Sequence, residues 1–313
     1  MRKELIILLL LLILLTGCPG GKTPPTTASG YIGGTDGVAS KLSIVSGQTN
    51  EVLDSGLEDF EMNVDLENKG EHAIKENEVL ATITGVDYNA FSLKQPSLRN
   101  VEPLGEIRNE GGKVPGGQAA LSFKANFADD LPVDQVYDLG VNVCYKYQTG
   151  ATTNLCLRKD ATKRGEATDK CKVDDPKPSV SSSSAPIQVK SIFQRPTGKN
   201  EVSFTLTIEN VGKGDVYLPT FLDTAQHCLD KADVKNKVEV SVSFANNKPA
   251  VVCPALQNSN KGTLQLIQNK AVLTCKIDTS KEQETTFTRS PNIQVSYVYK
   301  DLVSTKVTVK NAA

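Results

Sequence analysis

The chain has 313 residues, which is too long for one small hydrophobic core and suits two domains of ordinary size. Its formal net charge of -1 gives no basic excess, so we expect no binding to nucleic acid. With Trp 0, Met 2 and His 2, the chain has few side chains for aromatic ligand cages or imidazole metal sites, and we expect no cofactor and no metal.

The first 17 residues have the pattern of a secretory signal peptide. Arg2 and Lys3 precede an unbroken apolar run, Leu5–Leu15, which stops at Gly17. Such a run would form a helix only about 17 Å long, well short of the roughly 30 Å hydrocarbon core of a bilayer. We therefore predict a signal peptide over residues 1–17 and export of the chain.

Cys18 follows this signal peptide and is the predicted membrane anchor. The junction Leu15-Thr16-Gly17-Cys18 resembles the lipobox of prokaryotic lipoproteins, in which the cysteine carries the lipid and becomes the first residue of the mature chain. The resemblance implies that Cys18 is the lipid attachment site and that the membrane is one partner. The alternatives are an ordinary cleaved signal with a chance cysteine and an uncleaved anchor.

Two segments rich in Gly, Pro, Ser and Thr divide the rest of the chain. Residues 18–35 contain too few apolar side chains to offset chain entropy by burial, so they predict a flexible tether. Residues 176–186 contain four consecutive serines and predict a linker. The predicted domains are therefore residues 36–175 and residues 187–313.

Between these segments, apolar residues alternate with polar ones, which is the period of half-buried strands. The alternating runs are Met62–Leu66, Phe204–Ile208, Val238–Phe244, Thr263–Ile267, Ala271–Ile277 and Ile293–Tyr299. The one helical candidate is a short segment, Phe221–Asp233. Short strands at this spacing predict an all-β chain built of sandwiches or barrels.

The two halves repeat one another. Phe60–Gly70 (FEMNVDLENKG) aligns without a gap with Val202–Gly212 (VSFTLTIENVG) at an offset of 142 residues. Val141–Leu157 aligns with Ile293–Val309 at an offset of 152 residues. Any two amphipathic strands look alike, but two ungapped matches in the same order favour a duplicated fold. The repeat matches four tyrosines, interpreted as core residues of the inner face: Tyr145, Tyr147, Tyr297 and Tyr299.

Each half also contains a strand that ends in Asn-x-Gly, which we assign to a tight turn with left-handed backbone. The pieces Leu66–Gly70 and Ile208–Gly214 resemble the early strand and turn of cell-adhesion-related immunoglobulin-like domains of bacteria and archaea. The segment Gly33–Val38 resembles the opening of archaeal surface lipoproteins. The resemblance implies two tandem immunoglobulin-like β-sandwich domains and supplies no catalytic residues.

Six further cysteines, an even number in an exported chain, predict disulfides: Cys144, Cys156, Cys171, Cys228, Cys253 and Cys275. Metal binding would need close pairs of the C-x-x-C kind, which the sequence lacks. If residues 149–151 form a hairpin turn, Cys144 falls opposite Cys156 at disulfide distance.

The predicted pairs are Cys144–Cys156 and Cys253–Cys275, which leaves Cys171 to join Cys228 across the two halves. In the rival pairing, Cys156 joins Cys171 and Cys144 is left for Cys228. Six cysteines allow fifteen connectivities, so the sequence alone leaves this choice open.

The common catalytic motifs, including G-x-S-x-G, H-E-x-x-H and the P-loop, are absent from the sequence. We interpret His72 as a solvated loop residue and His227 as the neighbour of a disulfide rather than the base of a catalytic cysteine. The acidic residues Glu58, Asp59 and Glu61 lack the spacing of a calcium loop and are interpreted as a solvated strand entry, with loop-bound calcium as an alternative.

The sequence therefore predicts a non-enzymatic adhesion, scaffold or assembly module, exported and anchored to the outer face of the cell membrane. Its partners would be other surface proteins or polymers, recruited by loops or by unpaired strand edges. The main alternative is a ligand-binding lipoprotein that serves a transporter, with a concave pocket between residues 40–175 and 187–310. An enzyme is the third hypothesis, and clustered carboxylates in a cleft would be its sign.

Overall fold

The structure is a computed structural model, and it describes residues 30–109, 112–160, 171, 177–282 and 285–312. The predicted signal peptide, Cys18 and residues 18–29 of the predicted tether lie outside the described residues. Ile32 N–H and Gly33 N–H donate to the Glu71 carboxylate at 2.7 and 2.9 Å. The described end of the predicted tether is therefore attached to the fold.

The described residues form an all-β fold, as the sequence predicted. The strands are β1 (Val38–Val45), β2 (Glu51–Leu53), β3 (Asp59–Asn68), β4 (Val79–Thr84), β5 (Ser97–Arg99), β6 (Arg108–Asn109), β7 (Lys113–Val114), β8 (Gln118–Asn126), β9 (Gln135–Thr153), β10 (Leu155–Arg158), β11 (Val180–Ser182), β12 (Ile187–Gly198), β13 (Glu201–Asn210), β14 (Asp215–Tyr217), β15 (Lys237–Ser243), β16 (Val251–Val252), β17 (Lys261–Gln265), β18 (Lys270–Asp278), β19 (Thr286–Arg289) and β20 (Asn292–Lys310). Helical turns are short: α2 (Phe221–Thr224), η1 (Ala245–Asn247) and η2 (Pro254–Leu256). Among the described residues, no helix has the length and apolar character that crossing a membrane requires.

The first sandwich is built mainly from the first half of the chain. One of its sheets has the antiparallel order β1-β3-β8. This sheet packs on β4 and on the N-terminal half of β9 through a continuous hydrophobic core. Met62, Val64 and Leu66 of β3 are buried, whereas the residues between them are more exposed, so the predicted alternation is confirmed.

The second sandwich repeats this plan in the second half of the chain. Its sheet has the order β12-β13-β18-β16 and packs on β15 and the N-terminal half of β20. Phe204, Leu206 and Ile208 of β13 are buried in the positions that the repeat matches to β3. The first sandwich has no described strand in the place of β16, and this is the main difference between the two sheets.

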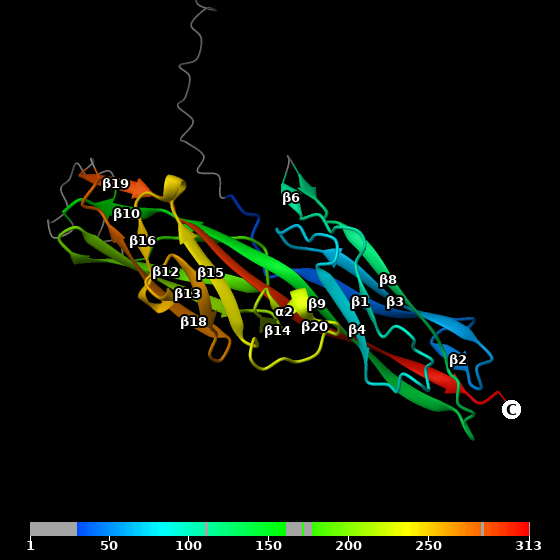
Figure 1. The fold of residues 1–313 in the computed structure, drawn as a ribbon. Helices are drawn as coiled ribbons and strands as arrows, with labels where there is room; N and C mark the ends of the chain where they lie inside the picture. Colours follow the sequence, from blue (N-terminus) through cyan, green and yellow to red (C-terminus); the bar gives the residue numbers. More distant parts are fainter. Residues whose placement is uncertain (1–29, 110–111, 161–170, 172–176, 283–284, 313) are drawn as a thin grey trace, which may run out of the picture. The chain divides into compact units, whose positions relative to one another are not determined.

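Strands β9 and β20 belong to both sandwiches, and Figure 1 shows them side by side in green and red. They pair antiparallel from Gln135 opposite Val309 to Ala151 opposite Ile293. The same sheet continues through β4 and β5 on one side and through β15 and β17 on the other. The two sandwiches therefore share one continuous sheet, and Tyr31–Ala313 forms one compact unit.

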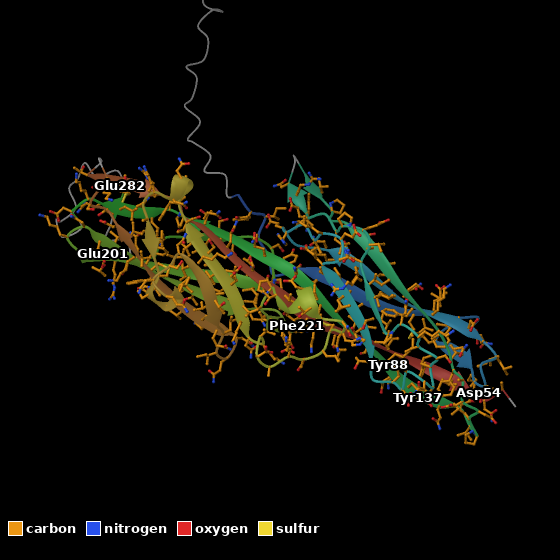
Figure 2. All side chains as sticks on the ribbon, viewed as in Figure 1. Asp54, Tyr88, Tyr137, Glu201, Phe221 and Glu282 are labelled. Carbon is orange, nitrogen blue, oxygen red and sulfur yellow. A yellow bond between two sulfur atoms is a disulfide. The ribbon has the colours of Figure 1, made fainter. Side chains whose placement is uncertain are left out.

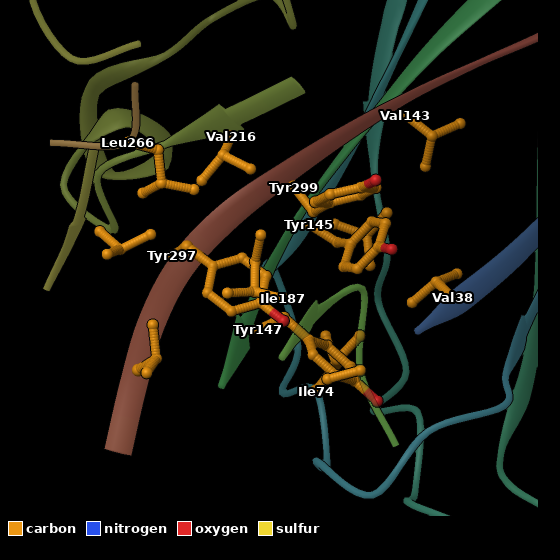
Figure 3. Packing of buried hydrophobic residues seen from close by; sticks show 14 of the residues in the cluster. Val38, Ile74, Val143, Tyr145, Tyr147, Ile187, Val216, Leu266, Tyr297 and Tyr299 are labelled. Atoms are coloured by element: carbon orange, nitrogen blue, oxygen red, sulfur yellow. The ribbon is translucent and has the colours of Figure 1, made fainter. Parts of the chain in front are cut away.

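The pairing of β9 with β20 has a local two-fold centre. Lys146 lies opposite Val298, and these two residues are separated by 152 positions, the offset of the sequence repeat. Rings from both strands meet at this centre and are at most 2% exposed (Figure 3). We name them the tyrosine quartet: Tyr145, Tyr147, Tyr297 and Tyr299. Their interpretation as core residues is confirmed.

The Asn-x-Gly motifs hold the tyrosine quartet in place. Asn68 Oδ1 accepts hydrogen bonds from Gly70 N–H and Tyr147 Oη, both at 3.1 Å. The second half repeats both bonds, at 3.2 and 3.3 Å, with Asn210, Gly212 and Tyr299. The matched hydrogen bonds follow the same offsets as the sequence repeat.

The predicted reason for these glycines is wrong. Neither Gly70 nor Gly212 has a left-handed backbone. A Cβ at either position would instead overlap the hydroxyl of Tyr147 or Tyr299. Glycine is needed because a tyrosine hydroxyl takes the space of its side chain.

The serine-rich segment predicted as a linker is built into the fold over its described residues. β11 pairs with β9, and Ser183, Ser184 and Ala185 are buried. Gly150 N–H donates to Ser183 Oγ at 3.0 Å, and Ser184 N–H donates to Glu71 at 2.7 Å. Composition suggested a solvated segment, but these serines satisfy buried backbone groups where the halves meet.

Candidate functional site

The cysteines form three disulfides, and two of the predicted pairs are wrong. The bonds are Cys144–Cys228, Cys156–Cys171 and Cys253–Cys275. The last is the predicted pair, and the first two are the rival pairing that the sequence left open. Residues 149–151 form no turn, because they continue β9 and pair with β20. Cys144 and Cys156 therefore lie along one extended stretch, and the predicted Cys144–Cys156 and Cys171–Cys228 bridges are both absent. Three disulfides are typical of a protein exported to an oxidising compartment.

The Cys144–Cys228 bond fastens a segment of the second half onto the first half. Cys144 lies in a small second core with Leu80 of β4, covered by Tyr217, Phe221 and Leu222. Phe221, labelled in Figure 2, stacks on Tyr217 with ring centroids 4.8 Å apart. Cys144 is therefore fully buried, because this segment covers it.

Hydrogen bonds reinforce the same contact. Arg99 Nη2 donates to Leu222 O and Ala225 O at 3.0 and 2.8 Å, and Cys228 N–H donates to Thr82 Oγ1 at 2.8 Å. The helix predicted over Phe221–Asp233 is limited to α2, because Ala225 is already extended. These contacts to β4 and β5 fix a non-helical path.

Neither histidine lies beside a free thiol in the described residues, because all six described cysteines form disulfides. His227 Nδ1 lies 2.7 Å from Ser97 Oγ, and its neighbour Cys228 is held in a disulfide. His72 packs edge-on against the Tyr147 ring at 5.3 Å, and burial lowers its pKa. His72 lies in a loop, as interpreted, but it is partly buried against Tyr147 and not fully solvated. Within the described part of the chain, no group of three or more His, Cys, Asp or Glu side chains is arranged to hold a metal.

The charged residues around Tyr217 are paired with one another. Asp230 accepts hydrogen bonds from Lys300 and Tyr217, which hold the pKa of its carboxyl well below the usual range. Lys235 contacts Asp215 at 3.0 Å, and this bond raises the lysine pKa. These ion pairs explain the charged cluster, which lies where β14 pairs with β20 and stabilises that pairing.

A groove of about 780 Å³ lies at one edge of the first sandwich. Ser122–Asn126 of β8 line one part of it, and residues of the 92–98 segment, which leads into β5, line another. Its apolar lining residues include Val45 and Leu98, and Phe60 and Phe123 also line it although they are almost fully buried. The groove therefore combines the edge of β8 with a mixture of polar and apolar residues.

Two acidic residues that the sequence suggested were merely solvated belong to this groove. Glu61 accepts a hydrogen bond from Ser122 Oγ at 2.9 Å, and Asp59 accepts one from Asn126 Nδ2 at 3.1 Å. Lys94 and Lys124 also line it, so the groove carries both signs of charge. These carboxylates join β3 to β8 and leave the outer side of β8 accessible.

The outer side of β8 presents backbone groups that pair with no described strand. β3 is the one strand paired with β8 among the described residues. Asn68 N–H donates to Gly117 O, so Gly117 directs its backbone groups toward β3. In an antiparallel pair every second residue does the same, which here includes Leu121, Phe123 and Ala125. The backbone N–H and C=O of Ser122 and Lys124 therefore face the groove.

Sequence reasoning missed this groove, although one signal could have revealed it. The second half contains Val251–Val252, next to Cys253, beside the strand Lys270–Asp278, and no described segment of the first half pairs in this way with Gln118–Asn126. This difference can be recognised only after β8 has been matched with β18, and that match depends on their pairing with β3 and β13.

Comparisons with known proteins give no family for this chain. No family model and no curated protein matches it. Solved structures similar to parts of it include the major pilin subunit BcpA of Bacillus cereus, at 9% identity and a TM-score of 0.18, covering 81% of this chain and 66% of the pilin. The serine-rich repeat protein Srr2 of Streptococcus agalactiae is similar at 9% identity and a TM-score of 0.14, covering 88% of this chain and 93% of Srr2.

Proposed function

We propose that this protein is an exported, membrane-anchored, non-enzymatic adhesion, scaffold or assembly module. Lipid on Cys18 would hold the chain at the outer face of the membrane, and residues 19–29 would separate the fold from the lipid surface. The three disulfides suit such a location, since they stabilise the fold outside the reducing cytoplasm.

The observation that carries the proposal is the edge of β8 in the groove of the first sandwich, which pairs with no strand in the described part of the chain. An unpaired strand edge is a ready template for another chain, and strand addition is a common way to bind a partner. The groove is lined by residues from 45 to 126, rather than by both halves of the chain. This location supports protein contact rather than the transporter alternative, which a pocket between the halves would have favoured.

Photo-crosslinking on intact cells tests the contact site. A photoreactive residue in place of Lys124 should give a covalent adduct with another surface protein, and Ser122→Pro should abolish that adduct. Proline at this position removes an N–H that faces the groove and keeps the backbone bonds to β3, while it also removes the side-chain bond from Ser122 Oγ to Glu61. The matched control places the photoreactive residue at Lys41, an exposed position of β1. Equal adducts from both positions, or an adduct unaffected by Ser122→Pro, would reject the proposed site.

The anchoring part of the proposal has its own test. Cys18→Ser should move the protein from the membrane fraction to the soluble extracellular fraction. Retention of the variant in the membrane would instead show that the apolar run Leu5–Leu15 is the anchor.

A further inference from the structure

Residues of the two sandwiches can be matched one to one through the sequence repeat and the strand pairing. β3 matches β13 at the offset of 142 residues, and each pairs with the next strand of its sheet. Glu61 lies opposite Lys124, and its counterpart Ser203 lies opposite Lys276. Lys124 on β8 therefore corresponds to Lys276 on β18.

The second sandwich fills the position that is open in the first. β16 pairs antiparallel with β18, with Val251 opposite Ile277 and Val252 opposite Lys276. Cys253 is bonded to Cys275, the counterpart of Phe123, so this short strand is also covalently fixed. By the same matching, the side of β8 that faces away from β3 corresponds to the side of β18 that β16 covers, and Ser122–Asn126 of β8 line the groove.

The side chains of β16 indicate what such an added strand presents. Val251 is 8% exposed and points inward opposite Ile277, whereas Val252 is 40% exposed opposite Lys276. The corresponding inward positions beside β8 lie opposite Phe123 and Ala125. A strand that fits there needs apolar side chains at alternate positions and a polar side chain between them.

From these observations we infer that the groove binds an extended polypeptide strand of a partner protein, antiparallel to β8, with apolar residues opposite Phe123 and Ala125 and a polar or acidic residue opposite Lys124. This inference rests on the proposed function and specifies the chemistry of its partner. The partner backbone exchanges hydrogen bonds with Ser122 and Lys124, and an acidic side chain complements the Lys124 ammonium group. Five residues of an extended strand span about 17 Å, enough to follow Ser122–Asn126.

A short synthetic peptide tests the inference on the purified protein with its disulfides intact. The probe is acetyl-Thr-Val-Asp-Val-Thr-Val-Thr-amide carrying a fluorophore, whose aspartate falls opposite Lys124 when the valines point inward. We expect saturable binding by fluorescence anisotropy. Methylation of the aspartate nitrogen and the central threonine nitrogen, which face β8, should weaken binding at least tenfold. Methylation of the central valine nitrogen, which faces away, should change it less than threefold.

The protein offers a matched pair of variants for the same measurement. Ser122→Pro should weaken binding at least tenfold. Ser40→Pro removes a backbone N–H that faces away from β3 on the other edge of the sheet, in β1, and should not change binding. The methylated peptides keep the test valid if either proline variant fails to fold, because they leave the protein unchanged.

The outcomes separate the inference from the proposed function. Equal binding of all the methylated peptides, or no binding of the probe, overturns the inference of strand addition. If the Lys124 adduct on cells is still abolished by Ser122→Pro, the groove remains the contact site and its partner is not an extended strand. If the adduct is insensitive to Ser122→Pro, the proposed contact site itself fails.

Discussion

Strands β8 and β18 occupy matched positions in the two sandwiches but have different surroundings. β18 is paired on both sides, with β13 and with β16, and a disulfide fixes the added strand. β8 is paired only with β3 among the described residues, and a groove runs along its other side. The second sandwich thus protects its edge with its own chain, while the first leaves the same edge available.

The centre of the molecule shows the opposite behaviour. Around the two-fold relation between β9 and β20, the halves keep the same tyrosines, the same Asn-x-Gly motifs and the same hydrogen bonds. The duplicated residues therefore hold the halves together, while the edges differ. A surface contact made at the differing edge would leave the shared core unchanged.

The largest expected effect comes from the shared centre. Gly212→Ala should destabilise the fold by about 3 to 4 kcal/mol, because the new Cβ overlaps the Tyr299 hydroxyl, displaces the ring and breaks its bond to Gly214 N–H, which measures 2.8 Å. Thermal unfolding under oxidising conditions measures the loss. The same change in the first half, Gly70→Ala, should be at least as severe.

Removing the hydroxyls distinguishes the two glycines. Tyr299→Phe should partly restore Gly212→Ala, because the other contacts of that Cβ begin at 3.0 Å. Tyr147→Phe should not restore Gly70→Ala, because Asp36 O and Ser184 O both lie 2.5 Å from that Cβ. Equal restoration at both sites would contradict the assigned cause.

The core and strands of both halves could be predicted from the sequence because they depend on local alternation. Met62, Val64 and Leu66 occupy every second position of their strand, and this period of two predicts their burial; the matched tyrosines identify the repeated strands. Such predictions need only the residues within one strand, because burial of one face of the strand produces the alternating pattern.

The errors arose where distant parts of the chain decide the local structure. Thr149-Gly150-Ala151 has turn-like composition, yet it stays extended because β20 supplies partners along its length. Gly150 is required because the Tyr31 ring lies against it. The wrong turn led directly to the wrong partner for Cys144. The groove was missed because it depends on the absence of a described strand on the outer side of β8, which local patterning does not reveal.

A change in the second sandwich can make its edge resemble that of the first. The double variant Cys253→Ala and Cys275→Ala should lose about 2 to 3 kcal/mol of stability, since the bond closes a chain separation of 22 residues. It should also free β16 from β18 part of the time. Calorimetry with the alternating valine peptide should then approach two sites per chain instead of one. A stoichiometry that stays at one would contradict the match between the two edges.

Asp301 is a position near the shared centre at which the two halves have different residues. Its counterpart at the repeat offset is Thr149, whose hydroxyl contacts Ile187 O at 2.6 Å and Tyr297 Oη at 3.1 Å. Burial raises the pKa of Asp301 to about 6 from 3.8, so its charge opposes folding once the pH exceeds that value. The folded state holds the proton more tightly, and stability therefore falls as the pH rises from 3.8 to about 6.

Asp301→Asn should accordingly stabilise the protein by about 1 to 2 kcal/mol at pH 7, a value reduced for partial solvent screening. Below pH 3.8 the variant and the parent should unfold at the same temperature. Asp138→Asn is the matched control, because it makes the same chemical change at a carboxylate that is 79% exposed. A constant advantage of Asp301→Asn at all pH values would assign the effect to packing instead of charge.

The smallest effect concerns the charge at the open edge. Lys124→Glu should leave thermal stability nearly unchanged, because surface charge changes are typically worth less than about 1 kcal/mol. It should weaken the aspartate peptide roughly threefold to tenfold and strengthen a peptide with lysine in that place, with both effects reduced by salt. Lys41→Glu on β1 serves as the control of equal charge. If both variants change the peptide affinity equally, long-range electrostatic attraction explains the preference for aspartate. If only Lys124→Glu changes it, the peptide lies along β8 in the register that β16 has on β18 in the second sandwich.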